Sequence, residues 1–211
     1  MSDLARKLSA DLAPVPRSWL PRRLLTGLGA GLAVSIVLVL AILGPRPDMG
    51  PAMHSMMFWA KLIYPLSLAA IAALAAERLA RPAASAAMRL IWLPVPLMLV
   101  AVLALIAFLF APPAMHEQML VGHSARLCPF LVLAAALPPL AGLVWAMRGF
   151  APTRLRETGF VIGLAAGGAG AFAYAWHCNE TGAPFLAIWY SLGMAAAAFL
   201  GWLSGPRLLR W

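Results

Sequence analysis

Six long apolar runs, separated by short polar stretches, make up most of the chain. They lie at roughly 24–43, 57–76, 90–110, 130–147, 159–177 and 185–204. A helix of about 20 predominantly apolar residues crosses the roughly 30 Å hydrocarbon core of a bilayer, and each run is close to that length. Lys61 is the only fully charged residue within them. The pattern predicts an all-α polytopic membrane protein, in which residues 24–204 form a bundle of six transmembrane helices.

The N-terminal segment, residues 1–23, is more polar and contains one short amphipathic pattern. Leu4, Leu8 and Leu12 recur at four-residue spacing, and Pro14 ends the pattern. This spacing predicts a helix of about three turns, which is too short to be stable alone in water. Its apolar stripe would lie either in the groove of a partner protein or on the surface of anionic lipid. Residues 205–211 form a short tail after the last run.

The composition and charge fit a protein whose main solvent is lipid. The chain is 63% hydrophobic and 11% charged, whereas soluble domains are about 45–50% apolar and about 25% charged. A net charge of +9 would suggest nucleic acid in a soluble protein. However, 13 of the 16 Lys and Arg residues fall in the N-terminal segment, the loops after the second and fourth runs, and the tail, and the exceptions are Arg46, Lys61 and Arg126. The positive-inside rule therefore predicts cytoplasmic termini and no direct contact with nucleic acid, and we expect Lys61 to extend its ammonium to the outer interface.

Two of the runs carry small residues at four-residue spacing. The first contains Gly27, Gly31 and Ser35, and the fifth contains Gly159, Gly163, Gly167 and Ala171. Such stripes allow two helices to approach closely. They indicate packing within one bundle or, alternatively, the interface of a homodimer.

With this orientation, all four histidines and both cysteines are expected at the outer ends of the runs or in outer loops. Cys128 precedes the fourth run and Cys178 ends the fifth, so both thiols are expected at a similar depth. A structural disulfide, a redox- or metal-responsive thiol pair, and two unrelated buried thiols are all compatible with this spacing. Thiolate and imidazole ligands suit soft or borderline ions, so Cys128, Cys178 and His177 are the candidate ligands of a transient soft metal ion.

The residues that common membrane enzymes require do not occur in the expected places. A disulfide oxidoreductase uses a C-x-x-C pair, and the chain contains none. Intramembrane haem would need facing histidines inside the runs, and a proton relay would need ionisable groups near the midplane. We therefore expect a protein that is not an enzyme and holds no resident cofactor.

Two strings in the chain resemble the NrsF-like family of six-span membrane anti-sigma factors. One is LSADLAPV at residues 8–15, and the more specific one runs from His177-Cys178-Asn179-Glu180 through Pro184-Phe185 to Trp189-Tyr190. The resemblance covers essentially the whole chain. It implies an inner-membrane anti-sigma factor that holds an extracytoplasmic-function sigma factor inactive through its cytoplasmic N-terminal segment, where Leu4, Leu8, Asp11 and Leu12 are the candidate contacts. It also implies that Cys128 and Cys178 perceive envelope stress such as heavy metal or oxidation.

Two other functions remain open on the sequence alone. One is a small permease or pore whose outer histidines and cysteines capture a metal ion. The other is a purely structural membrane partner, in which the cysteines contribute only to stability.

Overall fold

The computed structural model describes residue 16 and residues 18–81 and 86–210. The predicted amphipathic helix, with Leu4, Leu8, Asp11 and Leu12, lies outside the described residues. Its role in partner binding therefore stays a prediction.

Within the described ranges, six helical segments are long and apolar enough to cross a membrane, and each coincides with one predicted run. Four are single helices: α2 (Trp19–Ile42), α4 (Met56–Leu79), α8 (Cys128–Met147) and α9 (Leu155–Ala175). The third segment joins α5 (Ala87–Leu90) to α6 (Pro94–Phe110), and the sixth joins α10 (Ala183–Phe185), the π-helical turn η2 (Leu186–Tyr190) and α11 (Ser191–Leu208). The described residues contain no strand. The predicted all-α, six-span fold is confirmed, and the chain is a multi-pass membrane protein.

The helices extend beyond the apolar runs at several ends. The largest difference is in α2, which begins at Trp19 and includes Arg22 and Arg23. A helix can continue into polar residues because its backbone hydrogen bonds do not depend on lipid. Three short elements lie in the connections: α3 (Met49–Met53), the 3-10 turn η1 (Pro113–Met115) and α7 (His116–Val121).

The central helix of the bundle is α9. Its membrane-spanning window is 89% buried, against 17% for the window that contains α6. Gly159 of α9 faces the backbone of Gly201 in α11, and Gly163 faces Ala197, so close that a side chain on either glycine would collide with the other helix. The glycines of α9 thus allow two helix backbones to pack in direct contact.

The small residues of α2 are used in the same way. Gly27 faces Gly142 of α8, and Gly31 faces Pro139. Both predicted small-residue stripes are therefore buried inside one chain, which fits the packing interpretation. A homodimer through these faces would require the bundle to open.

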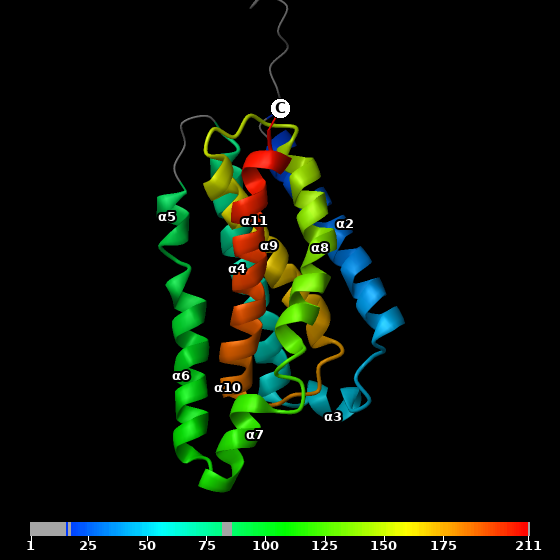
Figure 1. Cartoon of the computed structure of the whole chain (residues 1–211), viewed down its shortest axis with the longest axis vertical. Coiled ribbons are helices and arrows are strands. Elements are labelled where there is room, and N and C mark those ends of the chain that lie inside the picture. Colours follow the sequence, from blue (N-terminus) through cyan, green and yellow to red (C-terminus); the bar gives the residue numbers. More distant parts are fainter. Residues whose placement is uncertain (1–15, 17, 82–85, 211) are drawn as a thin grey trace, which may run out of the picture.

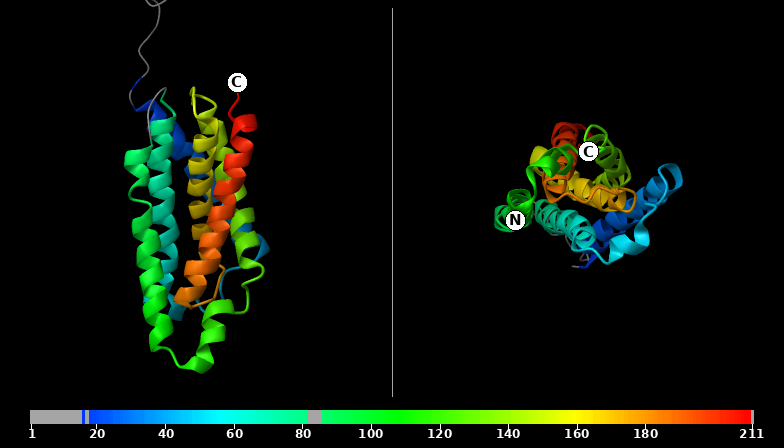
Figure 2. Two further views of the ribbon diagram at one scale, coloured as in Figure 1. Left: turned by 60° about the vertical axis from the view of Figure 1, so that its left-hand side comes forward. Right: turned by 90° about the horizontal axis from the view of Figure 1, so that it is seen from below.

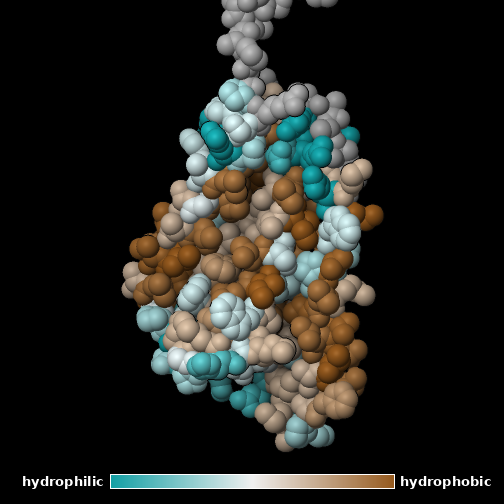
Figure 3. All heavy atoms as spheres, turned by 180° about the vertical axis from the view of Figure 1, so that it is seen from behind, coloured by the Kyte–Doolittle hydropathy of each residue, from teal (hydrophilic) through white to brown (hydrophobic). Residues whose placement is uncertain are grey.

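The outward faces of the helices are strongly apolar. Leu25, Ile63 and Leu105 are 68%, 61% and 57% exposed, respectively. Figure 3 shows hydrophobic residues around the middle of the bundle and hydrophilic residues gathered toward the end that bears the termini. Exposed apolar area on this scale is expected only where lipid, rather than water, is the solvent.

Both described ends of the chain lie at one end of the bundle. The start of α2 and the end of α11 both lie at the top of Figure 1, and the side view in Figure 2 also places them at one end. The opposite end carries α3, α7 and the loops before α4, α8 and α10. We call this opposite end the distal end.

Candidate functional site

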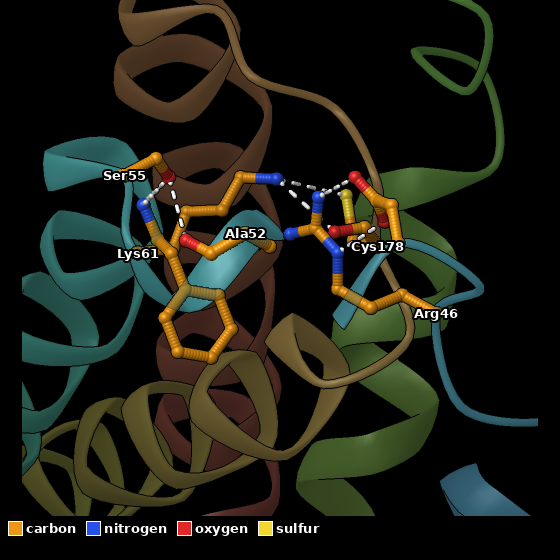
Figure 4. Close-up of polar contacts among 7 residues, drawn as sticks. Arg46, Ala52, Ser55, Lys61 and Cys178 are labelled. Carbon is orange, nitrogen blue, oxygen red and sulfur yellow. Dashed lines mark hydrogen bonds and ion pairs between the residues drawn. The ribbon is translucent and has the colours of Figure 1, made fainter. Parts of the chain in front are cut away.

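A buried lysine and a thiol meet at the distal end. Ser55 caps α4 by accepting a hydrogen bond from the backbone N–H of Phe58 (3.2 Å), and Lys61 lies in the second turn of that helix. The Lys61 side chain is not extended to the interface, because the residue is only 1% exposed. Its Nζ lies 3.3 Å from the carbonyl oxygen of Cys178 and 3.5 Å from the Cys178 sulfur. Figure 4 shows this contact beside Arg46, and the expectation that Lys61 reaches out to the interface was wrong.

The second thiol belongs to the same buried cluster. Cys128 is the first residue of α8 and is fully buried, and Cys178 follows the end of α9 and is 3% exposed. Both thiols are free in this structure. Both cysteines belong to the same apolar core as Tyr174 and Tyr190. Both cysteines are therefore buried and unpaired within the described residues, and their joint role as a responsive pair stays a prediction.

A buried arginine lies next to this cluster, in the loop after α2. Arg46 is 4% exposed, and its guanidinium donates two hydrogen bonds to Asp48, at 2.8 and 2.7 Å. These hydrogen bonds are the main reason why the pKa of Asp48 is below its usual value of 3.8 and the pKa of Arg46 is raised. The backbone N–H of Arg46 also donates to the carbonyl of Trp176 (3.1 Å), which ties this loop to the end of α9.

Glu180 joins the segment after α9 to the loop before α8. Its Oε1 accepts hydrogen bonds from the backbone N–H of His123 (2.7 Å), the backbone N–H of Ser124 (3.1 Å) and the Ser124 hydroxyl (3.1 Å). The chain reaches this geometry through Gly122, which has a φ of +55°. A Cβ at Gly122 would lie 2.5 Å from Oε2 of Glu180, so the position suits glycine for both reasons.

Two further residues of the family-like string also contact other loops. His177 Nδ1 lies 2.9 Å from the carbonyl oxygen of Gly44, and the indole N–H of Trp189 donates to the carbonyl of Leu120 (2.7 Å). In the described part of the chain, no group of three or more His, Cys, Asp and Glu side chains is close enough to hold a metal ion. A transient ion bound by Cys128, Cys178 and His177 stays a prediction, and the observed role of this string is to join the distal loops.

The helix that begins with Cys128 also holds the start of α2. At the far end of α8, Arg23 donates from Nε to the carbonyl of Ala146 (3.1 Å) and from Nη2 to that of Trp145 (3.2 Å), and its guanidinium lies 4.5 Å from the Trp145 ring centre. Midway along, the Ser35 hydroxyl donates to the carbonyl of Ala135 (2.7 Å). Pro139 has no N–H for that carbonyl, so Ser35 supplies the missing donor. These contacts make α2 and α8 a pair that connects the thiol cluster to the segment before Trp19.

The contacts of three polar residues at the distal end were not predicted from the sequence: that of Lys61 with Cys178, that of Arg46 with Asp48, and that of Glu180 with the loop before α8. The signal for Lys61 was present, since it is the only full charge in an apolar run, and such residues are usually functional. The partners of Arg46 and Glu180 depend on loop conformation, which the spacing of residues does not encode.

Comparison with known proteins identifies the family. A family model described as NrsF, negative regulator of sigma F, matches residues 8–211. The chain belongs to the NrsF family. It is 40% identical over 210 residues to a protein of Caulobacter vibrioides named anti-sigma-F factor NrsF, covering 99% of this chain and 98% of that protein. It is also 35% identical over 213 residues to the probable anti-sigma-F factor NrsF of Azospira oryzae, with the same coverage.

The family match bears directly on the sequence-based interpretation. The matched range, residues 8–211, contains both cysteines, the distal string and the LSADLAPV segment. The resemblance to NrsF-like proteins is thus confirmed for nearly the whole chain. No solved structure matches the chain.

Proposed function

We propose that this NrsF-family protein is an inner-membrane anti-sigma factor. Its N-terminal segment sequesters an extracytoplasmic-function sigma factor, and metal or oxidant stress perceived at Cys128 and Cys178 releases that factor. The observation that carries the proposal is the family match over residues 8–211, which includes part of the segment and both thiols. The family is one of negative regulators of a sigma factor, and the described part of the chain is almost entirely a membrane-embedded bundle.

The distribution of positive charge supports an orientation with both termini in the cytoplasm. The end of the bundle that bears the termini carries most of the arginines, whereas Arg46, Lys61 and Arg126 belong to the distal end. By the positive-inside rule, the arginine-rich end faces the cytoplasm and the thiol cluster faces the periplasm. The N-terminal segment then meets the sigma factor on the side where transcription occurs, and the thiols meet envelope stress on the other side.

The α2–α8 pair supplies a physical route between the two sides. Chemistry at Cys128 acts on the first residue of α8, and the far end of the same helix binds Arg23 through two carbonyls. A change in the position of α8 within the bundle would therefore move the start of α2 and the segment that precedes it. The signal needs to overturn a difference of only a few kcal/mol between two arrangements of the bundle.

A transcription reporter that depends on the sigma factor tests the binding half of the proposal. Leu4→Glu with Leu8→Glu places charge in the apolar stripe, so we expect constitutive expression without stress. Arg210→Ala, in the tail, is the matched control and should repress like the unaltered protein. Full repression by the Leu4→Glu, Leu8→Glu variant at equal membrane abundance would contradict binding through this stripe.

Serine substitutions test the sensing half separately. Cys128→Ser and Cys178→Ser should still repress the reporter but should lose induction by an oxidant or a soft metal ion, because neither variant can form the bond or the bridge. If both variants respond like the unaltered protein, the thiols are not the sensor. If both lose protein abundance and repression together, the cysteines are structural. If the thiols are not the sensor, the proposal that the N-terminal segment binds the sigma factor still stands.

A further inference from the structure

Lys61 is buried in surroundings that are unfavourable for its ammonium group. Burial of an ammonium is destabilising by several kcal/mol unless a partner of opposite charge accompanies it. Among residues 16, 18–81 and 86–210, no carboxylate lies within ion-pair distance of Lys61, since the ion pairs found are Arg46–Asp48, Glu77–Arg81 and Arg154–Glu157. The polar atoms that Nζ meets are the carbonyl oxygen and the sulfur of Cys178.

The other charged groups around Lys61 already have partners. The Arg46 guanidinium is neutralised by Asp48, and the Glu180 carboxylate accepts three hydrogen bonds from the loop before α8. The remaining titratable members of the apolar core are Cys128 and three tyrosines: Tyr64, whose hydroxyl shares a hydrogen bond with Ser191 (2.6 Å), Tyr174 and Tyr190. The Tyr190 ring centre lies 5.9 Å from Nζ. The sulfur of Cys178 is therefore the group that can supply a negative charge to Lys61.

One proton decides the charge state of this contact. Its transfer from Sγ of Cys178 to Nζ of Lys61 converts a thiol–amine pair into a thiolate–ammonium pair, and the net charge of the cluster does not change. A lysine beside a thiol favours the thiolate, which is the nucleophilic form. Cys128 differs, because no hydrogen bond to its sulfur occurs within the described residues. The two cysteines are thus chemically unequal.

We propose that Lys61 is a positioning residue that holds Cys178 as the attacking thiolate of a peroxide-sensing pair, with Cys128 as the resolving thiol. The inference rests on the proposed function and specifies its chemistry. An ammonium beside the sulfur also opposes the approach of a metal cation. The geometry therefore favours an oxidant over a soft metal ion as the direct reactant of Cys178.

The chemistry balances with a hydroperoxide as the oxidant. The Cys178 thiolate attacks the terminal oxygen of ROOH, the O–O bond breaks, and the leaving alkoxide takes a proton from Lys61 to give ROH. The products are a sulfenic acid on Cys178 and a neutral Lys61. Lys61 then removes the thiol proton of Cys128, whose thiolate attacks the Cys178 sulfur. The leaving hydroxide takes the proton from Lys61 and departs as water, and a Cys128–Cys178 disulfide remains.

The test is site-resolved oxidation of the reduced full-length protein in lipid nanodiscs. Hydrogen peroxide is the probe, dimedone traps sulfenic acid, and mass spectrometry reports each cysteine. In Cys128→Ser the sulfenic acid should accumulate at Cys178, because the resolving thiol is missing. In Cys178→Ser the Cys128 thiol should stay largely unmodified over the same time.

Lys61 is tested in the Cys128→Ser background by two substitutions. Lys61→Met should lower the rate at Cys178 at least about ten-fold, because the ammonium beside the sulfur is lost. Lys61→Arg, which keeps the charge, should retain most of the rate. Lys7→Met removes the only other lysine of the chain and is the matched control.

Three results would overturn the proposal: faster oxidation of Cys128 than of Cys178, an unchanged rate in Lys61→Met, or an equal loss of rate in Lys61→Met and Lys61→Arg. The last would mean that Lys61 controls access or folding rather than the charge on sulfur. No sigma factor is present in this assay, so its outcome is independent of the regulatory proposal. If the thiols react as described but oxidation fails to release a sigma factor, only the regulatory proposal fails.

Discussion

Removal of the Glu180 carboxylate should destabilise the distal end and leave the membrane-embedded helices intact. Glu180 is 9% exposed, and its Oε1 accepts hydrogen bonds from two backbone N–H groups and one hydroxyl. Glu180→Ala removes all three. Glu180→Gln keeps an acceptor oxygen in the same place and removes only the charge, which makes it the matched control.

The magnitude follows from the geometry. Each hydrogen bond to a charged group contributes about 1.5–3 kcal/mol, and donors left unsatisfied in a buried site are further destabilising. His123 is exposed and Ser124 is half-buried, so water can reach the freed N–H groups and recover part of the loss. We therefore expect about 2–4 kcal/mol for Glu180→Ala, below the sum of three charged hydrogen bonds, and about 1 kcal/mol for Glu180→Gln.

Equilibrium unfolding in mixed detergent micelles measures the free energy of unfolding for both variants, and limited proteolysis measures local opening. Glu180→Ala should expose the loop that contains His123 and Ser124 to protease before the bundle unfolds. Unfolding of Glu180→Ala at the same denaturant concentration as the unaltered protein would refute the reasoning. An equal loss in Glu180→Gln would show that charge, rather than the hydrogen-bond acceptor, carries the effect.

Three further predictions follow from the helix contacts and the Arg46–Asp48 pair. Ser35→Ala should lower the free energy of unfolding by about 0.6–1.7 kcal/mol. In the Pro139→Ala background, Ser35→Ala should lower it by less, because the alanine at position 139 brings a backbone N–H that can donate to the Ala135 carbonyl in place of Ser35. Gly201→Leu should prevent correct packing, as judged by monodispersity in detergent, whereas Gly29→Leu should be tolerated, because a Cβ at Gly29 meets nothing within 4 Å. Since the pKa of Asp48 is below its usual 3.8, the unaltered protein should be more stable than Asp48→Asn above about pH 5, and acid titration below about pH 4 should remove the difference; a constant difference down to pH 2 would contradict this.

The sequence predicts the six helices because a membrane requires each one to be long and continuously apolar. α8 is an example: its predicted range of 130–147 and its observed bounds, Cys128–Met147, differ by two residues at one end. The start of α2 is less predictable, since Arg22 and Arg23 end the apolar run but do not end the helix. The short helix α3 in the distal loops has no apolar period, and its place depends on contacts such as the Arg46–Asp48 pair.

The candidate site is partly predictable for a similar reason. Cys128 and Cys178 flank successive spans, so topology alone brings them to one end of the bundle. Their burial, and the contact of Cys178 with Lys61, depend on how α4 packs beside α9. Apolar runs give the length of a helix but not the direction in which each face points, and this is why the rotation of Lys61 into the bundle could not be predicted.

Co-purification tests the central claim most directly. The full-length protein is tagged at its C-terminus, co-expressed with the extracytoplasmic-function sigma factors of its source organism, solubilised in mild detergent and isolated. A variant that lacks residues 1–16 serves as the comparison, after its bundle is shown to unfold at the same temperature. The account predicts that one sigma factor is recovered with the full-length protein and lost with the truncated one. Recovery of no sigma factor under any condition, or equal recovery without residues 1–16, would contradict it.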